Sequence, residues 1–218
     1  MSDHRIQWFG DSALVLDCPP PASLACQKRI WALALAARRW DHVIDVVPGM
    51  NNLTLVFDPL RADPHALQAQ LLAAWQAPTA DTMTESRVIE IPVHYGGTAG
   101  PDLAEIADAK GMSADAFARR HAAGLYTVYF LGFQAGFSYL GGLDAALHTP
   151  RRAEPRMKVP AGSVAIGGEQ TGIYPSESPG GWNLIGHSDV VLFDPTREPS
   201  SLMQPGDQIR FTLASVTA

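Results

Sequence analysis

The chain has 218 residues, of which 46% are hydrophobic, 17% charged and 8% aromatic. This composition supports a packed interior of one large or two small domains and excludes a wholly disordered chain. The formal net charge of −6 argues against a general binder of nucleic acid or of anionic membranes. Cys18 and Cys26 are too few for a disulfide framework or a thiolate metal site, so we expect free thiols in a reducing compartment.

Neither a targeting segment nor a membrane span is expected. Residues 1–5 lack the basic start and apolar run of a signal peptide. The longest apolar run, residues 30–37, is much shorter than the roughly 20 residues of a membrane helix. We therefore expect a cytoplasmic protein that binds neither membrane nor nucleic acid.

The first part of the chain alternates short β-rich runs with helical patterns. Residues 13–16, 43–47 and 53–57 are predicted strands, and residues 48–52 are a predicted turn. A first helix is predicted to begin near Ser23, because apolar side chains then recur at the spacing of one buried face: Ile30, Leu33, Ala34 and Ala37.

A second helix is predicted to begin with Asp63 as its N-cap and Pro64 in its first turn. Its apolar side chains Leu67, Leu71 and Trp75 step by four residues and share one face. Residues 1–80 are therefore predicted to form a small α/β domain with helices on one face of a sheet.

The pattern changes after a polar segment at residues 78–85, which is a predicted linker. Residues 88–93 are strand-like. Asp102 with Glu105 resembles the capping box of a helix that Gly111 closes. Ser113 is the predicted cap of another short helix, which runs to about residue 122.

From residue 125 onward no helical period remains. Of the 19 glycines, 11 lie between Gly132 and Gly186, so the backbone there must turn sharply or approach other groups closely. This pattern predicts an all-β barrel or sandwich, and a second domain over residues 86–218 of an α+β protein. The short apolar runs that predict its strands are residues 126–130, 163–166, 182–185, 190–193 and 208–213.

The common catalytic signatures are missing from the sequence. It contains no Walker loop, no Gly-x-Ser-x-Gly elbow, no His-Glu-x-x-His and no Cys-x-x-Cys, so the catalytic residues stay unknown. Four histidines are scattered without metal-ligand spacing, and we expect no metal site and ordinary surface or hydrogen-bonded roles for them: His94, His121, His148 and His187.

A cationic cluster stands out in this acidic chain. Arg151, Arg152 and Arg156 lie within six residues, and Lys158 follows. Guanidinium groups bind carboxylates and phosphates with two parallel hydrogen bonds, which favours an anion site. Alternatively, the arginines pair with nearby acids such as Glu154, and the residues alone leave both interpretations open.

Aromatic residues suggest a buried anchor and a partner surface. Trp182 follows a predicted tight turn at residues 179–181, and we expect it to be buried in the core or in an interface. A second aromatic stretch is a candidate partner surface, with burial in the core as the alternative: Phe133, Phe137, Tyr139 and Leu140.

Several segments together resemble the KipI / allophanate hydrolase subunit 1 family. They are Gly-Phe-x-x-Gly-Phe-x-Tyr-Leu at residues 132–140, Pro-Arg-x-x-x-Pro-Arg at 150–156, Val-Pro-Ala-Gly-Ser-Val at 159–164 and Ser-Pro-Gly-Gly-Trp at 178–182. The resemblance extends over nearly the whole chain. Ala135 departs from the family pattern, which usually has proline there, and makes that turn less rigid.

Within this family, residues 148–156 and 184–187 look most like the B subunits of bacterial 5-oxoprolinases. The resemblance implies a cyclophilin-like β-barrel for the second domain. It also implies a role in the ATP-dependent opening of 5-oxo-L-proline to L-glutamate, together with subunits A and C. Since the chain has no phosphate loop, we expect ATP to bind largely on another subunit and the chain to be inactive alone.

We predict substrate contacts from Arg152, Arg156, Ser163, Tyr174 and His187. Two other functions occur among relatives of this kind. One is inhibition of a sensor histidine kinase, as in KipI-type proteins, and the other is a subunit role in urea carboxylase or allophanate hydrolase-related enzymes.

Overall fold

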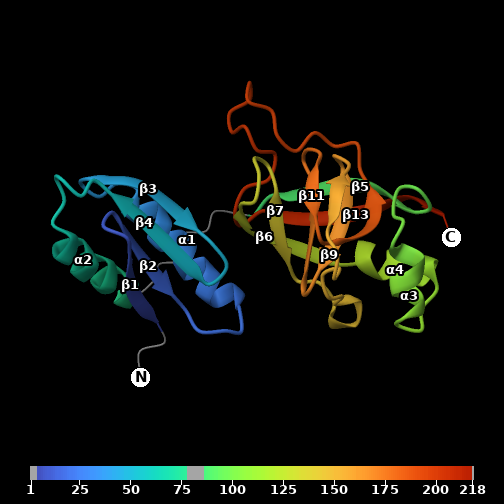
Figure 1. Cartoon of the computed structure of the whole chain (residues 1–218), viewed down its shortest axis with the longest axis horizontal. Coiled ribbons are helices and arrows are strands. Elements are labelled where there is room, and N and C mark those ends of the chain that lie inside the picture. Colours follow the sequence, from blue (N-terminus) through green and yellow to red (C-terminus); the bar gives the residue numbers. More distant parts are fainter. Residues whose placement is uncertain (1–3, 78–85, 218) are drawn as a thin grey trace. The chain divides into compact units, whose positions relative to one another are not determined.

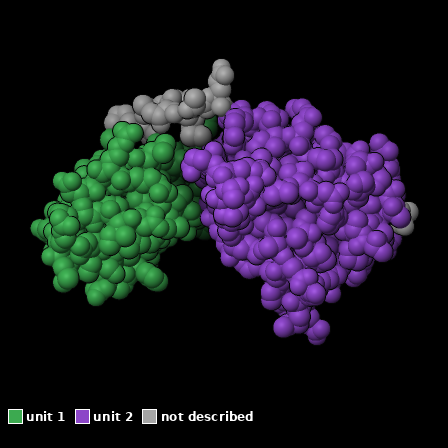
Figure 2. Space-filling view, turned by 90° about the horizontal axis from the view of Figure 1, so that it is seen from above, with its two compact units in different colours: residues 1–85 green, residues 86–218 purple. Residues whose placement is uncertain are grey.

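The computed structural model describes residues 4–77 and 86–217, so the predicted linker at residues 78–85 lies outside the described residues. The chain forms two compact units, residues 1–85 and 86–218 (Figure 2). Among the described helices, none is long and apolar enough to cross a membrane.

The first unit is an antiparallel sheet in the strand order β1-β2-β4-β3, accompanied by two helices in its described part (Figure 1). Strand β1 was not predicted, because it lies at the sheet edge, where Trp8 and Phe9 stay exposed and no buried apolar run marks it. The elements are β1 (Arg5–Phe9), β2 (Ala13–Asp17), α1 (Leu24–Ala37), β3 (Val43–Pro48), β4 (Asn52–Phe57) and α2 (Pro64–Gln76).

Both helices begin where their capping residues predict. The Ser23 hydroxyl accepts a hydrogen bond of 3.1 Å from the backbone N–H of Cys26 at the start of α1. The Asp63 carboxylate accepts from the backbone N–H groups of His65 and Ala66 at 2.9 and 3.2 Å. Each cap satisfies a donor that the first helical turn leaves without a partner.

One core joins both helices to the same face of this sheet. Alternate residues of β2 and β4 are buried, as expected for strands with one covered face. The predicted arrangement is confirmed by the buried side chains that form this core: Leu14, Leu16, Ile30, Leu33, Leu53, Leu55, Phe57, Leu67, Leu71 and Trp75.

The second unit contains a closed barrel in the order β10-β7-β6-β13-β5-β12-β9, counted over its described residues. Strands β5 and β13 pair in parallel, while the other barrel neighbours are antiparallel. The fold class predicted from the sequence, a small α/β domain followed by a β-barrel domain, is confirmed. The barrel strands are β5 (Val88–Gly96), β6 (Leu125–Leu131), β7 (Ser138–Gly141), β9 (Ser163–Gly167), β10 (Gln170–Ile173), β12 (Asn183–His187) and β13 (Gln208–Thr217).

Five further elements complete the described part of this unit. Helices α3 (Leu103–Asp108) and α4 (Ala114–Ala122) lie beside one end of the barrel and bury apolar side chains in its core (Figure 1). Strands β8 (Arg156–Val159) and β11 (Ser178–Gly180) form a separate antiparallel pair. A single turn of 3₁₀ helix, residues 145–147, lies between β7 and β8.

One predicted strand and one predicted turn were wrong. Residues 190–193 form no strand, and only an isolated bridge joins Phe193 to Ser201. Their apolar character has a different cause, because Leu192 is buried in the barrel core. Residues 178–180 form β11, so Gly180 pairs with Arg156 of β8 instead of standing in a tight turn.

The imidazole of His121 is buried in the barrel interior and is hydrogen-bonded through both ring nitrogens. The hydroxyl of Thr171 donates to the carbonyl of Ala165, so it accepts from Nε2–H of His121 at 2.9 Å. Nδ1 of His121 then accepts from the Tyr95 hydroxyl at 2.8 Å. The ring stacks on Phe211 with centroids 4.7 Å apart. The network fixes one neutral tautomer, and burial lowers the pKa of His121 to about 3.

This burial predicts an acid-sensitive barrel. The ordinary pKa of His121 is 6.5, so below that pH the unfolded chain takes up a proton that the folded chain excludes. We expect the free energy of unfolding to fall as the pH drops from 6.5 toward 3, by up to about 1.4 kcal/mol per pH unit from this group.

Urea unfolding between pH 7 and pH 4.5 measures this dependence. A His121→Gln variant keeps a donor and an acceptor but does not titrate, so its stability should fall less steeply with pH. His94→Gln is the matched control, because it makes the same substitution at an exposed position. Equal slopes for His121→Gln and the parent chain would contradict the assignment.

Candidate functional site

A second, smaller core lies outside the barrel interior of the second unit. Along β9, Val164 and Ile166 face the main barrel core, whereas Ala165 points to the opposite side. This alternation gives the barrel wall an outer apolar face. The side chains that pack there are Phe137, Val159, Ala165, Tyr174, Trp182 and Leu184, with Tyr139 against them.

A cavity of about 210 Å³ opens at this outer core. Its walls are aromatic, apart from Pro155, the backbone at Gly180 and Gly181, and two cationic side chains, Arg151 and Arg152. The aromatic side chains that line it are Phe133, Phe137, Tyr139, Tyr174 and Trp182. A small apolar space with few polar groups at its edge is typical of a ligand site.

Phe137 is the centre of the aromatic walls. Its ring centroid lies 5.0 Å from that of Tyr139, 5.3 Å from Tyr174 and 5.6 Å from Trp182, in edge-to-face arrangements. Such pairs are favourable beyond their buried area. Burial raises the pKa of both Tyr139 and Tyr174, so both hydroxyls are neutral at physiological pH.

Glycines make room for these rings. A Cβ atom on Gly167 would overlap the Trp182 indole, and one on Gly180 would overlap the Tyr174 hydroxyl. The large rings therefore lie directly on the backbone of β9 and of β11. This close approach accounts for the glycines at positions 167 and 180. Trp182 is 5% exposed, so its predicted burial is confirmed.

The aromatic stretch predicted as a partner surface divides between core and exterior. Phe137 and Leu140 are buried, which supports core packing for them. Phe133 is 59% exposed and has a φ of +65°, which is unusual for a bulky residue. Its ring packs edge-on against Phe137, at 5.4 Å between centroids.

The loop that carries Phe133 contains the alanine that departs from the family pattern. The backbone N–H of Phe137 donates to the carbonyl of Gln134, which closes a four-residue turn. Ala135 occupies the second position of that turn and Gly136 the third, with a φ of +83°. Proline and glycine favour these two positions in type II turns, so alanine keeps the turn while losing the rigidity of proline.

Asp102 anchors the loop beside the cavity. Its carboxylate accepts two hydrogen bonds from Arg156, at 2.7 and 2.9 Å, and one from Arg152 Nη1 at 3.0 Å. The backbone N–H of Leu184 donates to the same carboxylate at 2.7 Å, while the Asp102 N–H donates to the Leu184 carbonyl at 3.0 Å. The Asp102 side chain is only 5% exposed. One carboxylate thus joins the start of α3, strand β12 and the arginine loop.

This arrangement corrects the predicted capping box. Asp102 precedes α3 as its N-cap residue, but its side chain makes no capping hydrogen bond. The carboxylate faces the arginines instead. Nor does Glu154, the acid named in the alternative interpretation, form an ion pair with a described residue; Asp102 is the partner of both Arg152 and Arg156.

The cluster around Asp102 keeps a surplus of positive charge. Two guanidinium groups share the Asp102 carboxylate and Arg151 adds a third cation, so one positive charge remains even when Glu154 is counted. In addition, Nε of Arg152 is buried without a hydrogen-bond partner among the described residues. Such an unsatisfied donor is costly in a native structure, and functional sites are one place where it occurs.

The predicted substrate residues fall into two groups. Arg152 and Tyr174 line the cavity, and Arg156 supports Arg152 through Asp102. Ser163 and His187 are not among the lining residues.

Instead, Ser163 and His187 pair across β9 and β12. His187 Nε2 donates to the Ala161 carbonyl at 3.0 Å, and the neighbouring Gly162 N–H donates to the Tyr174 carbonyl at 2.7 Å. This second group therefore holds the loop that positions Tyr174. Substrate contact by all five residues stays a prediction.

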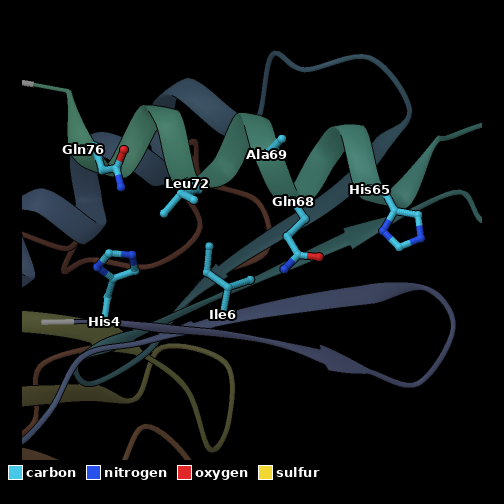
Figure 3. A pocket seen from close by; sticks show the side chains of 7 residues that line it. All are labelled: His4, Ile6, His65, Gln68, Ala69, Leu72 and Gln76. Carbon is cyan, nitrogen blue, oxygen red and sulfur yellow. The ribbon is translucent and has the colours of Figure 1, made fainter. Parts of the chain in front are cut away.

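The first unit contains a different hollow, a groove of about 560 Å³ between the start of β1 and helix α2 (Figure 3). His4 and Ile6 line one side, and His65, Gln68 and Gln76 are among the residues of the other side. The lining includes no Asp, Glu, Lys or Arg and no buried side chain. We therefore place the candidate site at the aromatic cavity. Across the described residues, no group of three His, Cys, Asp or Glu side chains is arranged to hold a metal ion.

Known proteins of similar sequence agree on one family. The family model of the carboxyltransferase domain, subdomain C and D, matches residues 4–203. A protein of Escherichia coli O157:H7, named as the B subunit of 5-oxoprolinase, is 50% identical over 97% of this chain and 96% of its own length. The chain belongs to the family of 5-oxoprolinase B subunits. Family members of the same name from Haemophilus influenzae and Bacillus subtilis are 47% and 33% identical, over 95% and 97% of this chain.

Solved structures share the fold of this family. TTHA0988 is 40% identical with a TM-score of 0.81 over 93% of this chain. The match occupies only 40% of the TTHA0988 chain, so the rest is further sequence joined to this fold. The uncharacterized protein PH0987 from Pyrococcus horikoshii is 39% identical over 97% of this chain and 98% of its own, with a TM-score of 0.58. The K. lactis urea amidolyase, at 19% identity and a TM-score of 0.79, shares the fold.

Because the Asp102 carboxylate binds two arginines, we expect its replacement to destabilise the barrel. Asp102→Asn removes the charge from a buried ion network and leaves both guanidiniums uncompensated. Breaking such a pair costs roughly 3–5 kcal/mol. Because Arg152 and Arg156 are 33% and 25% exposed, we expect the lower end, about 3 kcal/mol.

Urea unfolding at pH 7 measures the change. Glu90→Gln is the matched control, since it removes the carboxylate of the exposed pair with Arg210, whose side chains are 60% and 51% exposed. The control should change little. A loss for Asp102→Asn no larger than that of the control would show that the network does not stabilise the fold.

Proposed function

We propose that the chain is the B subunit of an ATP-dependent 5-oxoprolinase, which opens 5-oxo-L-proline to L-glutamate together with subunits A and C. The observation that carries this proposal is 50% identity, over nearly the full length of both chains, to a protein that bears this B-subunit name. The agreement of three such relatives, down to 33% identity, supports it.

The chemistry explains why such an enzyme uses ATP and several subunits. A five-membered lactam is a stable amide, so its carbonyl carbon must be activated before water attacks it. The C–N bond then breaks, and the ring nitrogen leaves as the amine of glutamate. Since the sequence has no Walker loop, ATP binds largely on another subunit in this proposal. The chain alone is then inactive, and it works in the cytoplasm.

A partner chain is supported by the way the fold occurs in TTHA0988. There, the matched region is covalently joined to other sequence that makes up the larger part of the chain. Separate subunits that associate would reproduce that arrangement without the covalent link. The exposed ring of Phe133, which lines the aromatic cavity and packs edge-on against buried Phe137, is available for such contact.

Within this proposal, the aromatic cavity is where the chain meets the substrate or an activated intermediate. Arg152 and Tyr174 contact the ligand, while Arg156 holds Arg152 through Asp102. Ser163 and His187 act through the loop that they hold against Tyr174. The surplus positive charge of the arginine loop supports binding of a carboxylate or phosphate there.

Reconstitution tests the proposed function directly. Purified A and C subunits, mixed with this chain, should release glutamate from 5-oxo-L-proline only when ATP and all three chains are present. Omission of each chain in turn, and of ATP, provides the controls. Co-purification of the chain with the C subunit reports assembly separately from activity.

Two outcomes would contradict the proposal. If the three chains assemble but release no glutamate from 5-oxo-L-proline, the proposed 5-oxoprolinase role is wrong. Inhibition of the autophosphorylation of a sensor histidine kinase by this chain, without any 5-oxoproline turnover, would favour the KipI-type role instead.

A further inference from the structure

The three neighbouring arginines have different surroundings. Arg152 and Arg156 direct guanidinium donors to the buried Asp102 carboxylate. Arg151 is exposed, lines the cavity and forms no ion pair with any described residue. Of the two cationic side chains that line the cavity, Arg151 is therefore the one that shares its charge with no carboxylate of the described residues.

Aromatic packing leaves the hydrogen-bond donors of Arg151 available. Its Cζ atom lies 6.0 Å from the centroid of the Trp182 ring, within the range of a cation–π interaction. A guanidinium that approaches an aromatic ring uses its charge and its flat face, whereas its N–H groups point outward in the plane. The aromatic contact thus holds the side chain near the cavity wall and leaves its N–H donors available for a ligand.

The charge of Arg151 also acts on two tyrosines of the cavity, Tyr139 and Tyr174. Burial raises the pKa values of Tyr139 and Tyr174, and the positive charge of Arg151 acts against that rise at both hydroxyls. Arg151 therefore adds a cation without a carboxylate partner to an apolar space that is bounded by two neutral tyrosines and Trp182. A ligand that fits this space has an apolar body and one negative group.

The volume restricts the size of that ligand. At about 210 Å³, the cavity is smaller than the roughly 300–1,000 Å³ of sites for drug-sized molecules. A single five-membered ring with a carboxylate suits both the volume and the charge. Long anions such as nucleotides do not.

We infer that Arg151 binds the carboxylate of 5-oxo-L-proline, with the lactam ring of the substrate packed against the aromatic walls of the cavity. The choice of substrate rests on the proposed function, whereas the choice of residue rests on the surroundings of the three arginines. Arg156 is a poor alternative, because both of its terminal nitrogens donate to buried Asp102 and an anion could use them only if they were withdrawn from it. Arg152 lines the cavity and keeps its Nε free of partners among the described residues, but it already shares its charge with Asp102, so it supplies a secondary contact.

A fluorescence titration tests the inference on the full chain. Trp182 is the one tryptophan of residues 86–218 in the sequence and lines the cavity, so ligand entry should change its emission. Two probes separate ring from charge: 5-oxo-L-proline, and 2-pyrrolidinone, which has the same lactam ring without the carboxylate. Trp182→Phe should abolish the signal for both probes.

The variants then assign the carboxylate contact. Arg151→Ala should lower the affinity for 5-oxo-L-proline at least about tenfold, because this probe loses a charge-assisted hydrogen bond. The affinity for 2-pyrrolidinone should stay unchanged, because it has no carboxylate. Arg151→Lys should recover part of the loss, since lysine keeps the charge but not the planar fork. Arg119→Ala, which removes an exposed arginine of α4, is the matched control and should change neither probe.

The same variants in the reconstituted three-subunit enzyme give a second measurement. Arg151→Ala should raise the KM for 5-oxo-L-proline by a similar factor, with unchanged thermal stability. Equal affinity of the parent chain and Arg151→Ala for 5-oxo-L-proline, or no Trp182 response in either the free chain or the complex, would overturn the inference. Normal turnover by Arg151→Ala would overturn it while leaving the proposed function intact, whereas absent turnover by the parent complex removes the proposed function alone.

Discussion

The position of the cavity depends on one buried carboxylate. Asp102 receives hydrogen bonds from Arg152, Arg156 and the backbone of Leu184, and these partners come from segments 50 to 82 residues away in the chain. A charge that is 5% exposed requires such partners, because desolvation without them is very unfavourable. The requirement fixes where the arginine loop lies relative to α3 and β12. The rims of the cavity follow from that placement.

The interior of the cavity has a different origin. Glycine at positions 167 and 180 lets Trp182 and Tyr174 lie directly on backbone, which a Cβ atom would prevent. The rings then pack edge to face around Phe137 and leave a hollow between them. The ion pairs of Asp102 therefore determine where the rim of the cavity lies, while the glycines at positions 167 and 180 determine how its aromatic walls pack. Neither feature alone would make a site for a small anion.

The sequence predicted those features that depend on neighbouring residues. The helix caps at Ser23, Asp63 and Ser113 were predicted correctly, because a cap uses a residue and the N–H groups two or three positions later. Asp102 has the same local signature, yet its carboxylate pairs with arginines 50 and 54 residues away. Nothing in the local pattern distinguishes these two uses of an aspartate.

The local sequence also does not distinguish the roles of neighbouring arginines in the cluster. Arg152 donates to Asp102, whereas Arg151 remains without an ion pair among the described residues. The three guanidiniums outnumber the carboxylates of Asp102 and Glu154, so together these groups carry one net positive charge in a chain of net charge −6. Repulsion between the guanidiniums is tolerated because Arg151 is solvated and partly stabilised by Trp182. A bound carboxylate relieves that repulsion as well as forming its own hydrogen bonds, so the charge imbalance itself favours an anionic ligand over a neutral one of the same shape.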